Sequence, residues 1–252
     1  MDLNCDMGEI AEAIADGTQE ALMGSITSAN IACGGHAGDE ATMHATIEQA
    51  LRHGVAVGAH PGYPDKENFG RLERKMPSEA VADFVREQVE ALGRVAERLG
   101  AAVIHVKPHG ALYNQAVHDR ELAAAIANGV ARWRRDVILV GLAESPMLEA
   151  FTEAGFRVAG EAFADRRYEA NGTLRSRKFA DALIRDPKEA AAQALSIARE
   201  GALTAHEGTR VRLRADTICI HGDTPGAPEI AAAVAEALRE AQVRLAAPQA
   251  AG

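Results

Sequence analysis

The sequence has few cysteines, and their placement argues against a cross-linked or zinc-stapled protein. Cys5, Cys33 and Cys219 are an odd number, lie far apart and form no Cys-x-x-Cys pair among 252 residues. A disulfide framework or a structural zinc site is therefore not expected. Each cysteine lies in an apolar run, where a buried small side chain is the ordinary interpretation and a nucleophilic thiol is the alternative.

Long apolar runs and basic stretches are absent as well. No run approaches the roughly 20 residues of a membrane span. The N-terminus has no basic region followed by an apolar one, so we expect no signal peptide and a cytoplasmic protein. The formal net charge of −9 disfavours nucleic acid and anionic membranes as partners, because both select basic patches.

Three motifs of nucleotide and serine chemistry are also missing. The chain has no Gly-x-x-x-x-Gly-Lys-Ser/Thr loop, no strand-linked Gly-x-Gly-x-x-Gly and no Gly-x-Ser-x-Gly. The sequence therefore shows neither a nucleotide site of its own nor a serine nucleophile.

What the chain does have is a regular alternation of short apolar runs with helical patterns. The runs are near-continuously apolar, which is typical of strands buried on both faces. We expect strands at 2–6, 28–33, 55–60, 102–107, 137–142, 157–163 and 217–221. We expect helices at 40–52, 77–99, 119–135, 145–154, 187–200 and 228–241.

This alternation predicts an α/β fold with a parallel sheet and helical crossovers. Seven β/α units favour a single-domain (β/α) barrel with seven strands over an open sheet. Residues 202–214 break the alternation and predict a hairpin that turns at Glu207-Gly208. We expect one domain over residues 1–245 and a disordered tail over 246–252.

Polar residues collect at the C-terminal ends of the predicted strands, where α/β barrels keep their active sites. Five of the nine histidines lie at or beside these ends: His36, His60, His105, His109 and His221. Each residue alone has a structural explanation, such as a helix cap or a hydrogen-bonded histidine. Their joint presence on one rim is what a purely structural interpretation explains poorly.

One lysine and one histidine of the fourth strand need separate interpretations. Lysine is scarce in this chain, and Lys107 lies between Val106 and Pro108 rather than in polar surroundings. His105 lies on the same face of the strand as Lys107, so it either lines the barrel or only fills it.

Four of the rim residues are suitable metal ligands, namely Asp6, His36, His60 and His109. The chain has no His-x-x-x-His spacing, and these four would have to converge from four different strands. We predict no metal site, and a metal-dependent amidohydrolase or deacetylase remains an alternative function in which a divalent metal takes part.

Six motifs, in order along nearly the whole chain, resemble the LamB/YcsF family. They are DLNCDMGE at 2–9, SANIACGGHAGD at 28–39, GAHPGYPD at 58–65, VKPHGALY at 106–113, FADRRY at 163–168 and IHGDTPG at 220–226. The sequence departs from the family at Gly35, where an aromatic residue is expected, and over residues 10–19. We expect the missing aromatic side chain to enlarge or loosen the site near His36.

The resemblance implies a barrel related to the glycoside hydrolase/polysaccharide deacetylase type. It also implies ATP-dependent opening of 5-oxo-L-proline to L-glutamate, with ATP as cosubstrate, in a complex with two partner subunits, B and C. A non-catalytic binding role is the second alternative.

From the residues on the rim we predict two sets of site residues. The predicted catalytic residues are Asp6, Lys107, His109, His36 and His60. The predicted substrate-binding residues are Asn4, Glu9, Asn30, Asp165, Arg166, His221 and Asp223. In this hypothesis Lys107 and Arg166 neutralise a phosphate or oxyanion, where fixed charge acts best. Asp6 or His109 takes a proton from water, and the other histidines position the ring or protonate the leaving nitrogen.

Overall fold

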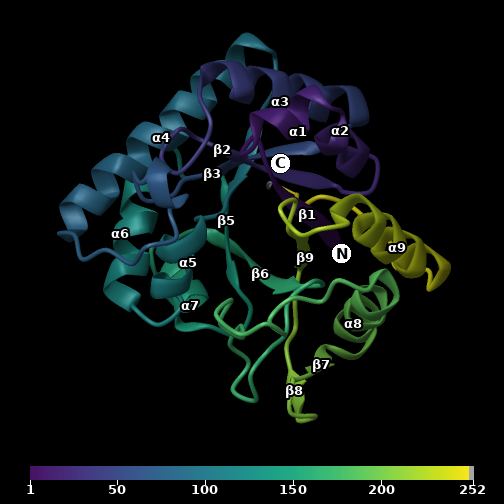
Figure 1. The fold of residues 1–252 in the computed structure, drawn as a ribbon. Coiled ribbons are helices and arrows are strands. Elements are labelled where there is room, and N and C mark those ends of the chain that lie inside the picture. The colour runs from purple at the N-terminus through teal and green to yellow at the C-terminus, as the bar shows by residue number, and fades with distance from the viewer. Residues whose placement is uncertain (250–252) are drawn as a thin grey trace.

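The computed structural model describes residues 1–249, and its centre is a closed barrel of seven parallel strands (Figure 1). The order around the barrel is β1-β2-β3-β4-β5-β6-β9, and β9 closes it by pairing with both β6 and β1. The strands are β1 (Asp2–Met7), β2 (Ser28–Ala32), β3 (Ala56–His60), β4 (Val103–Val106), β5 (Ile138–Leu142), β6 (Arg157–Phe163) and β9 (Thr217–Ile220). The predicted single α/β barrel with seven strands is confirmed.

Helices surround the barrel on its outside (Figure 1). Six of them match the predicted helices: α3 (Glu40–His53), α4 (Ser78–Arg98), α6 (Arg120–Ala131), α7 (Pro146–Glu153), α8 (Pro187–Glu200) and α9 (Ala227–Glu240). The sequence interpretation missed α1 (Ala11–Ala15), α2 (Thr18–Met23), α5 (Gly110–Ala116) and the 3₁₀ turn η1 (Lys66–Asn68). Helix α5 was missed because Pro108 and Gly110 usually end an element, whereas here Gly110 begins the helix at φ +55°.

The break in the alternation is a hairpin, as predicted. β7 (Ala202–Thr204) and β8 (Arg210–Arg212) pair antiparallel on either side of Glu207-Gly208. In the predicted tail, the amide of Ala246 donates to the carbonyl of Met1 at 3.0 Å, and residues 250–252 lie outside the described part of the chain. Over residues 1–249 no helix combines the length and the apolar character that crossing a membrane requires.

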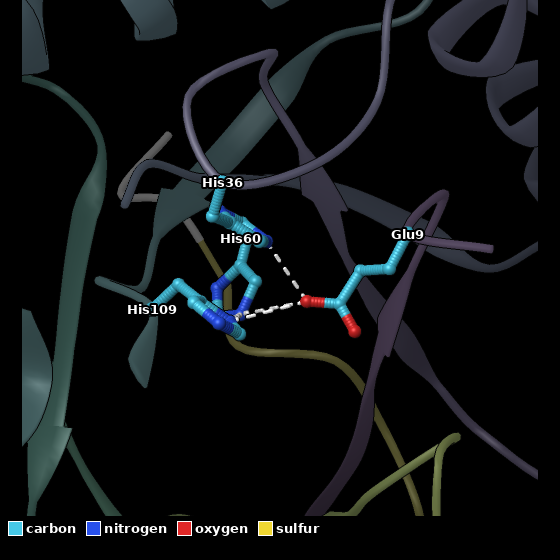
Figure 2. A group of neighbouring side chains, drawn as sticks. All are labelled: Glu9, His36, His60 and His109. Atoms are coloured by element: carbon cyan, nitrogen blue, oxygen red, sulfur yellow. Dashed lines mark hydrogen bonds and ion pairs between the residues drawn. The ribbon is translucent and has the colours of Figure 1, made fainter. Parts of the chain in front are cut away.

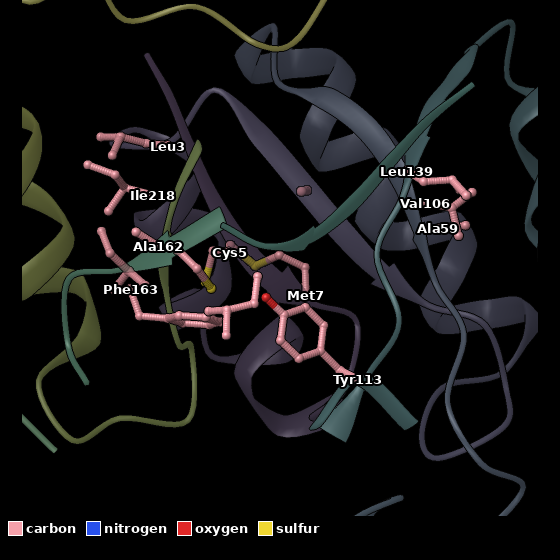
Figure 3. Packing of buried hydrophobic residues seen from close by; sticks show 14 of the residues in the cluster. Leu3, Cys5, Met7, Ala59, Val106, Tyr113, Leu139, Ala162, Phe163 and Ile218 are labelled. Atoms are coloured by element: carbon pink, nitrogen blue, oxygen red, sulfur yellow. The ribbon is translucent and has the colours of Figure 1, made fainter. Parts of the chain in front are cut away.

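The outer face of the barrel wall is apolar and packs under the helices. Along β1, Leu3, Cys5 and Met7 belong to this layer, and Leu3 pairs in register with Ile218 of β9, which belongs to it as well (Figure 3). Side chains alternate between the two faces of a strand, so the residues between them point into the barrel.

The inner face of the barrel is polar, although both faces are buried. The side-chain amide of Asn4 donates to Thr217 Oγ1 at 2.7 Å and to Glu161 Oε1 at 3.0 Å. The Asp2 carboxylate accepts from Ser28 and Thr217 at 2.8 and 2.6 Å. Buried polar groups are tolerated when they are hydrogen-bonded. The barrel interior is therefore a connected polar network, unlike the apolar layers that fill many barrels.

Candidate functional site

A cavity of about 640 Å³ opens at the C-terminal ends of the strands. Eight of the predicted site residues line it: Asp6, Glu9, His60, Lys107, His109, Arg166, His221 and Asp223. The other four, Asn4, Asn30, His36 and Asp165, are buried behind its wall. Residues from β1, β3, β4, β6 and β9 thus meet at one end of the barrel, because the strands are parallel and their ends coincide.

Lys107 is buried at the base of this cavity and is surrounded by acceptors. Its ammonium lies 2.8 Å from Glu161 Oε1, 3.0 Å from Asp6 Oδ1, 3.1 Å from Cys219 Sγ and 3.3 Å from Asn4 Oδ1. Burial alone would lower the pKa of Lys107, but the neighbouring negative charges outweigh it and hold the pKa well above its usual range. The group is a fixed cation between two carboxylates.

Asp6 faces the cavity as an ionised carboxylate. Its Oδ1 accepts from Lys107 and from the Asn30 amide at 2.9 Å, and its Oδ2 lies 3.3 Å from His60 Nε2. Burial would raise the pKa of Asp6, but its contacts with His60 and with the Lys107 ammonium outweigh burial and hold the pKa well below its ordinary value. His105 supports this arrangement from below, because its Nε2 lies 2.8 Å from Asn30 Oδ1.

Three imidazoles converge on one oxygen of Glu9 (Figure 2). Glu9 Oε1 lies 2.9 Å from His36 Nε2, 3.1 Å from His109 Nδ1 and 3.9 Å from His60 Nε2. The rings of His36 and His109 are stacked, with centroids 3.6 Å apart and planes within 2°, and His60 stands perpendicular to both. Burial lowers the pKa of His36 to about 4, so this ring is neutral near pH 7.

Backbone carbonyls fix the tautomers of two of these rings. His60 Nδ1 lies 2.7 Å from the carbonyl of Lys107, and His109 Nε2 lies 2.9 Å from the carbonyl of Phe69. A carbonyl oxygen only accepts, so both nitrogens carry the proton that they donate. The remaining nitrogens, His60 Nε2 and His109 Nδ1, face each other at 3.0 Å.

A second orienting pair lies across the cavity. The fully buried carboxylate of Asp165 accepts from His221 Nδ1 at 2.9 Å and from Thr224 Oγ1 at 2.7 Å. The His221 ring also stacks on Phe163, with centroids 5.2 Å apart. The ring of His221 is therefore held in a fixed orientation, and one of its nitrogens lies within 4.8 Å of an oxygen of Asp6.

One wall of the cavity is cationic. Asp223 pairs with Arg177 at 3.0 Å and with Arg71, so one carboxylate serves two guanidinium groups. Arg166 is buried beside them and donates to the carbonyl of Arg175 at 2.8 Å, while its Nε has no partner among residues 1–249. Burial and the charge of Arg177 lower the pKa of Arg166 to about 10, which leaves it charged at neutral pH.

Several site residues were missed by sequence reasoning. Glu161 is absent from the predicted site residues, although a carboxylate inside the apolar run of β6 is a usable signal for a buried ion pair. Arg71 and Arg177 reach the cavity from long connections after β3 and β6. No local pattern marks those two arginines, because only the fold brings the connections to the rim.

The two departures from the family pattern have structural explanations. A Cβ at Gly35 would lie 2.3 Å from Gln88 Oε1 and 2.7 Å from the carbonyl of Gly62, so the space is filled. The expected loosening near His36 is therefore wrong, and His36 is only 1% exposed. In the segment 10–19, Gln19 accepts from the amide of Gly8 at 2.7 Å, which anchors the loop that carries Glu9.

All three cysteines are buried and unpaired, which confirms the structural interpretation. Burial raises the pKa of Cys33 to about 12 and holds those of Cys5 and Cys219 well above the ordinary value. A thiol that stays protonated is a poor nucleophile.

Comparisons with known proteins agree on one relationship. The chain matches the LamB/YcsF family over residues 1–251. It is 48% identical over 249 residues to the A subunit of 5-oxoprolinase from Chloroflexus aggregans, covering 99% of each chain. It is 45% identical to the protein of that name from Bacillus licheniformis, covering 97% of each. The crystal structure of a lactam utilization protein from Thermus thermophilus superposes with a TM-score of 0.91 at 43% identity, covering 98% of each chain. The chain therefore belongs to the LamB/YcsF family.

Proposed function

We propose that this chain is the A subunit of a 5-oxoprolinase and carries the site where 5-oxo-L-proline is opened to L-glutamate. The observation that supports this most is 48% identity, over 99% of both chains, to a protein of that name. The cavity is compatible with the substrate, which is a small lactam with one carboxylate. It offers cations on one wall and acid and base groups on the other.

The proposed reaction couples ring opening to ATP, because an unstrained amide is a poor electrophile. ATP phosphorylates the lactam oxygen and leaves as ADP. Water then adds to the activated carbon, and the C–N bond breaks as the ring nitrogen takes a proton. A second water hydrolyses the resulting acyl phosphate to glutamate and phosphate.

Asp6 and His221 are placed to move the protons in this sequence. Both side chains line the cavity, and an oxygen of Asp6 lies within 4.8 Å of a ring nitrogen of His221. We assign Asp6 as the base that takes a proton from water, because its carboxylate lines the cavity and is ionised at neutral pH. His221, oriented by Asp165, gives the proton to the leaving nitrogen.

Lys107 takes a different role from the one expected from the sequence. Its ammonium has three N–H donors and four acceptors within 3.3 Å, on Glu161, Asp6, Cys219 and Asn4, so no donor is left over for substrate. We therefore assign it as a positioning residue that fixes the Asp6 carboxylate, rather than as a direct partner of the developing oxyanion.

The cationic wall is the proposed site for the negative charges of the substrate. The buried Nε of Arg166 is unpartnered within the described part of the chain, and the guanidinium of Arg177 lies close enough to lower the pKa of Arg166. A carboxylate or phosphate oxygen placed between them would relieve this repulsion and accept charge-assisted hydrogen bonds.

ATP enters the proposal as a cosubstrate of the complex, handled with subunits B and C. The sequence offers no phosphate-binding loop of its own, which is why the partners are part of the proposal. A reaction that consumes ATP also places the complex in the cytoplasm.

The test is production of glutamate from 5-oxoproline and ATP by this chain alone and by the chain combined with subunits B and C. We expect turnover only from the combination. In it, Asp6→Asn and Lys107→Met should each lower turnover at least about a hundredfold. The control Lys75→Met changes an exposed lysine and should leave turnover unchanged.

Two results would contradict the proposal. Robust turnover by the isolated chain would refute the need for the complex. Normal turnover by folded Asp6→Asn and Lys107→Met complexes would favour the alternative of a binding role, in which a partner carries out the chemistry.

A further inference from the structure

We propose that Glu9, His60 and His109 form a binding site for a single divalent transition-metal ion, with zinc as the preferred ion. The inference rests on the directions of the lone pairs in this cluster. It goes beyond the proposed reaction, and it concerns metal binding by this chain alone.

The first argument is that hydrogen-bond acceptor atoms of Glu9, His60 and His109 lie against one another without a donor between them. His60 and His109 each donate their outer ring N–H to a backbone carbonyl, at 2.7 and 2.9 Å. In the neutral form of both rings, the inner nitrogens present lone pairs toward each other at 3.0 Å, with Glu9 Oε1 at 3.1 Å from His109 Nδ1 and Asp6 Oδ2 at 3.3 Å from His60 Nε2. Buried lone pairs in contact repel unless a cation lies between them, either a shared proton or a metal ion.

The second argument is that the outer hydrogen bonds are those of metal-binding histidines. Such histidines almost always donate the second ring nitrogen to a carbonyl or a carboxylate, which fixes the tautomer and aims the free lone pair at the metal. Both His60 and His109 meet this condition through the chain itself, from the carbonyls of Lys107 and Phe69.

The third argument is the spacing of the three ligand atoms. His109 Nδ1 lies 3.0 Å from His60 Nε2 and 3.1 Å from Glu9 Oε1, and the distance between His60 Nε2 and Glu9 Oε1 is 3.9 Å. A point about 2.0 Å from all three atoms exists for these separations, which matches zinc–nitrogen and zinc–oxygen bond lengths. The rings of His60 and His109 are perpendicular, at 88°, so their ring planes can intersect at one ion.

His36 is excluded from this ligand set by its stacking on His109. Two parallel rings with centroids 3.6 Å apart cannot both hold one ion in the plane of the ring, where the lone pair lies. We therefore assign His36 as the donor that orients Glu9, from its Nε2 to Glu9 Oε1 at 2.9 Å. Two histidines and one glutamate with a fourth position open toward the cavity is a ligand set of catalytic zinc sites.

The choice of zinc follows from the ligands. Two neutral imidazoles with one carboxylate suit zinc better than magnesium or calcium, which prefer oxygen ligands alone. Glu9, His60 and His109 all line the cavity, so an ion can enter from it.

The experiment is metal binding by the purified chain without partners. The chain is stripped with a chelator, loaded with Zn²⁺, dialysed and analysed for metal. We expect one equivalent per chain, and intense visible bands of a four-coordinate centre when Co²⁺ replaces Zn²⁺. Zinc should also raise the Tm of the chain, because it binds only the folded state.

Variants separate this site from adventitious binding. His60→Gln and His109→Gln should each weaken zinc binding more than about a hundredfold and abolish the rise in Tm, whereas His36→Gln should weaken it about 10- to 100-fold. The control His44→Gln changes an exposed histidine on α3 and should bind as the parent does.

The proposal is overturned if the parent chain retains no more metal than His60→Gln, or if the Co²⁺ form lacks the four-coordinate bands. It is also overturned if nitrogen NMR shows a proton shared by His60 and His109 that excess zinc does not displace. None of these readouts uses turnover, so they are independent of the test of the proposed function.

Discussion

Replacing Lys107 by Met should remove much of the stability that the base of the barrel cavity contributes. The substitution keeps most of the side-chain volume and removes a cation that contacts both Asp6 and Glu161. Glu161 is fully buried, so water cannot take over the role of the ammonium. Breaking a buried ion pair from one side typically costs about 3–5 kcal/mol.

A carboxylate left without its counter-charge can instead take up a proton, and the cost of doing so sets an upper limit of similar size on the loss of stability. Holding a carboxyl of ordinary pKa in its neutral form at pH 7 costs about 4 kcal/mol, at 1.36 kcal/mol for each pH unit. We therefore expect Lys107→Met to lower the free energy of unfolding by about 3–5 kcal/mol. The measurement is urea denaturation followed by circular dichroism at pH 7, with Lys75→Met as an exposed control that changes it by less than about 0.5 kcal/mol.

The double variant Lys107→Met/Glu161→Gln tests the cause. Glu161→Gln removes one of the two stranded charges and keeps an oxygen that can accept from the amide of Asn4. We expect the double variant to cost less than the sum of the single variants, with a coupling of about 1–3 kcal/mol. Strictly additive losses, or a loss below about 1 kcal/mol in Lys107→Met, would refute the view that Lys107 is the shared counter-charge.

Two further predictions concern packing and pH. Gly35→Ala should lower the free energy of unfolding by about 1–3 kcal/mol, because its Cβ would meet Gln88 and the carbonyl of Gly62. The control Gly24→Ala has room for a Cβ and should change the free energy of unfolding little. Equal losses for the two variants in urea denaturation would contradict the close approach at Gly35. Burial alone would raise the pKa of Asp165, but the contact with His221 outweighs burial and lowers the pKa. The ionised carboxylate therefore stabilises the fold at pH values above about 3.9, the ordinary pKa of an aspartate, and this stabilisation is lost as the pH falls further. The difference in unfolding free energy between the parent and Asp165→Asn should therefore shrink below about pH 4, and a difference that grows in acid would argue against it.

Much of the fold follows from local sequence patterns. Each predicted strand is found, because short apolar runs bounded by polar or glycine residues leave few other ways to bury their side chains. Helix α5 was missed because the local signals at its start are those of a chain break. Pro108 and Gly110 usually end an element, and only the packing of the loop at Gly70 makes Gly110 the start of a helix.

The site was predictable as a set but not in its internal order. Strand ends that carry Asp6, Lys107 and His109 point to one rim whenever the strands are parallel. The sequence does not tell which of them touches solvent. Lys107 proved to be enclosed by acceptors, and His36 proved to lie behind His109 rather than on the cavity.

The sequence by itself determined the seven β/α units, the rim on which the polar residues gather and the family to which the chain belongs. These follow from periodicity and from motifs that are continuous along the chain. Tertiary structure alone decided that Glu161 pairs with Lys107, that Arg71 and Arg177 share Asp223, and that three histidine rings gather around the Glu9 carboxylate. The physical reason is that charge pairing and tautomers depend on distances between residues far apart in the chain, which barrel closure sets and local patterns do not encode.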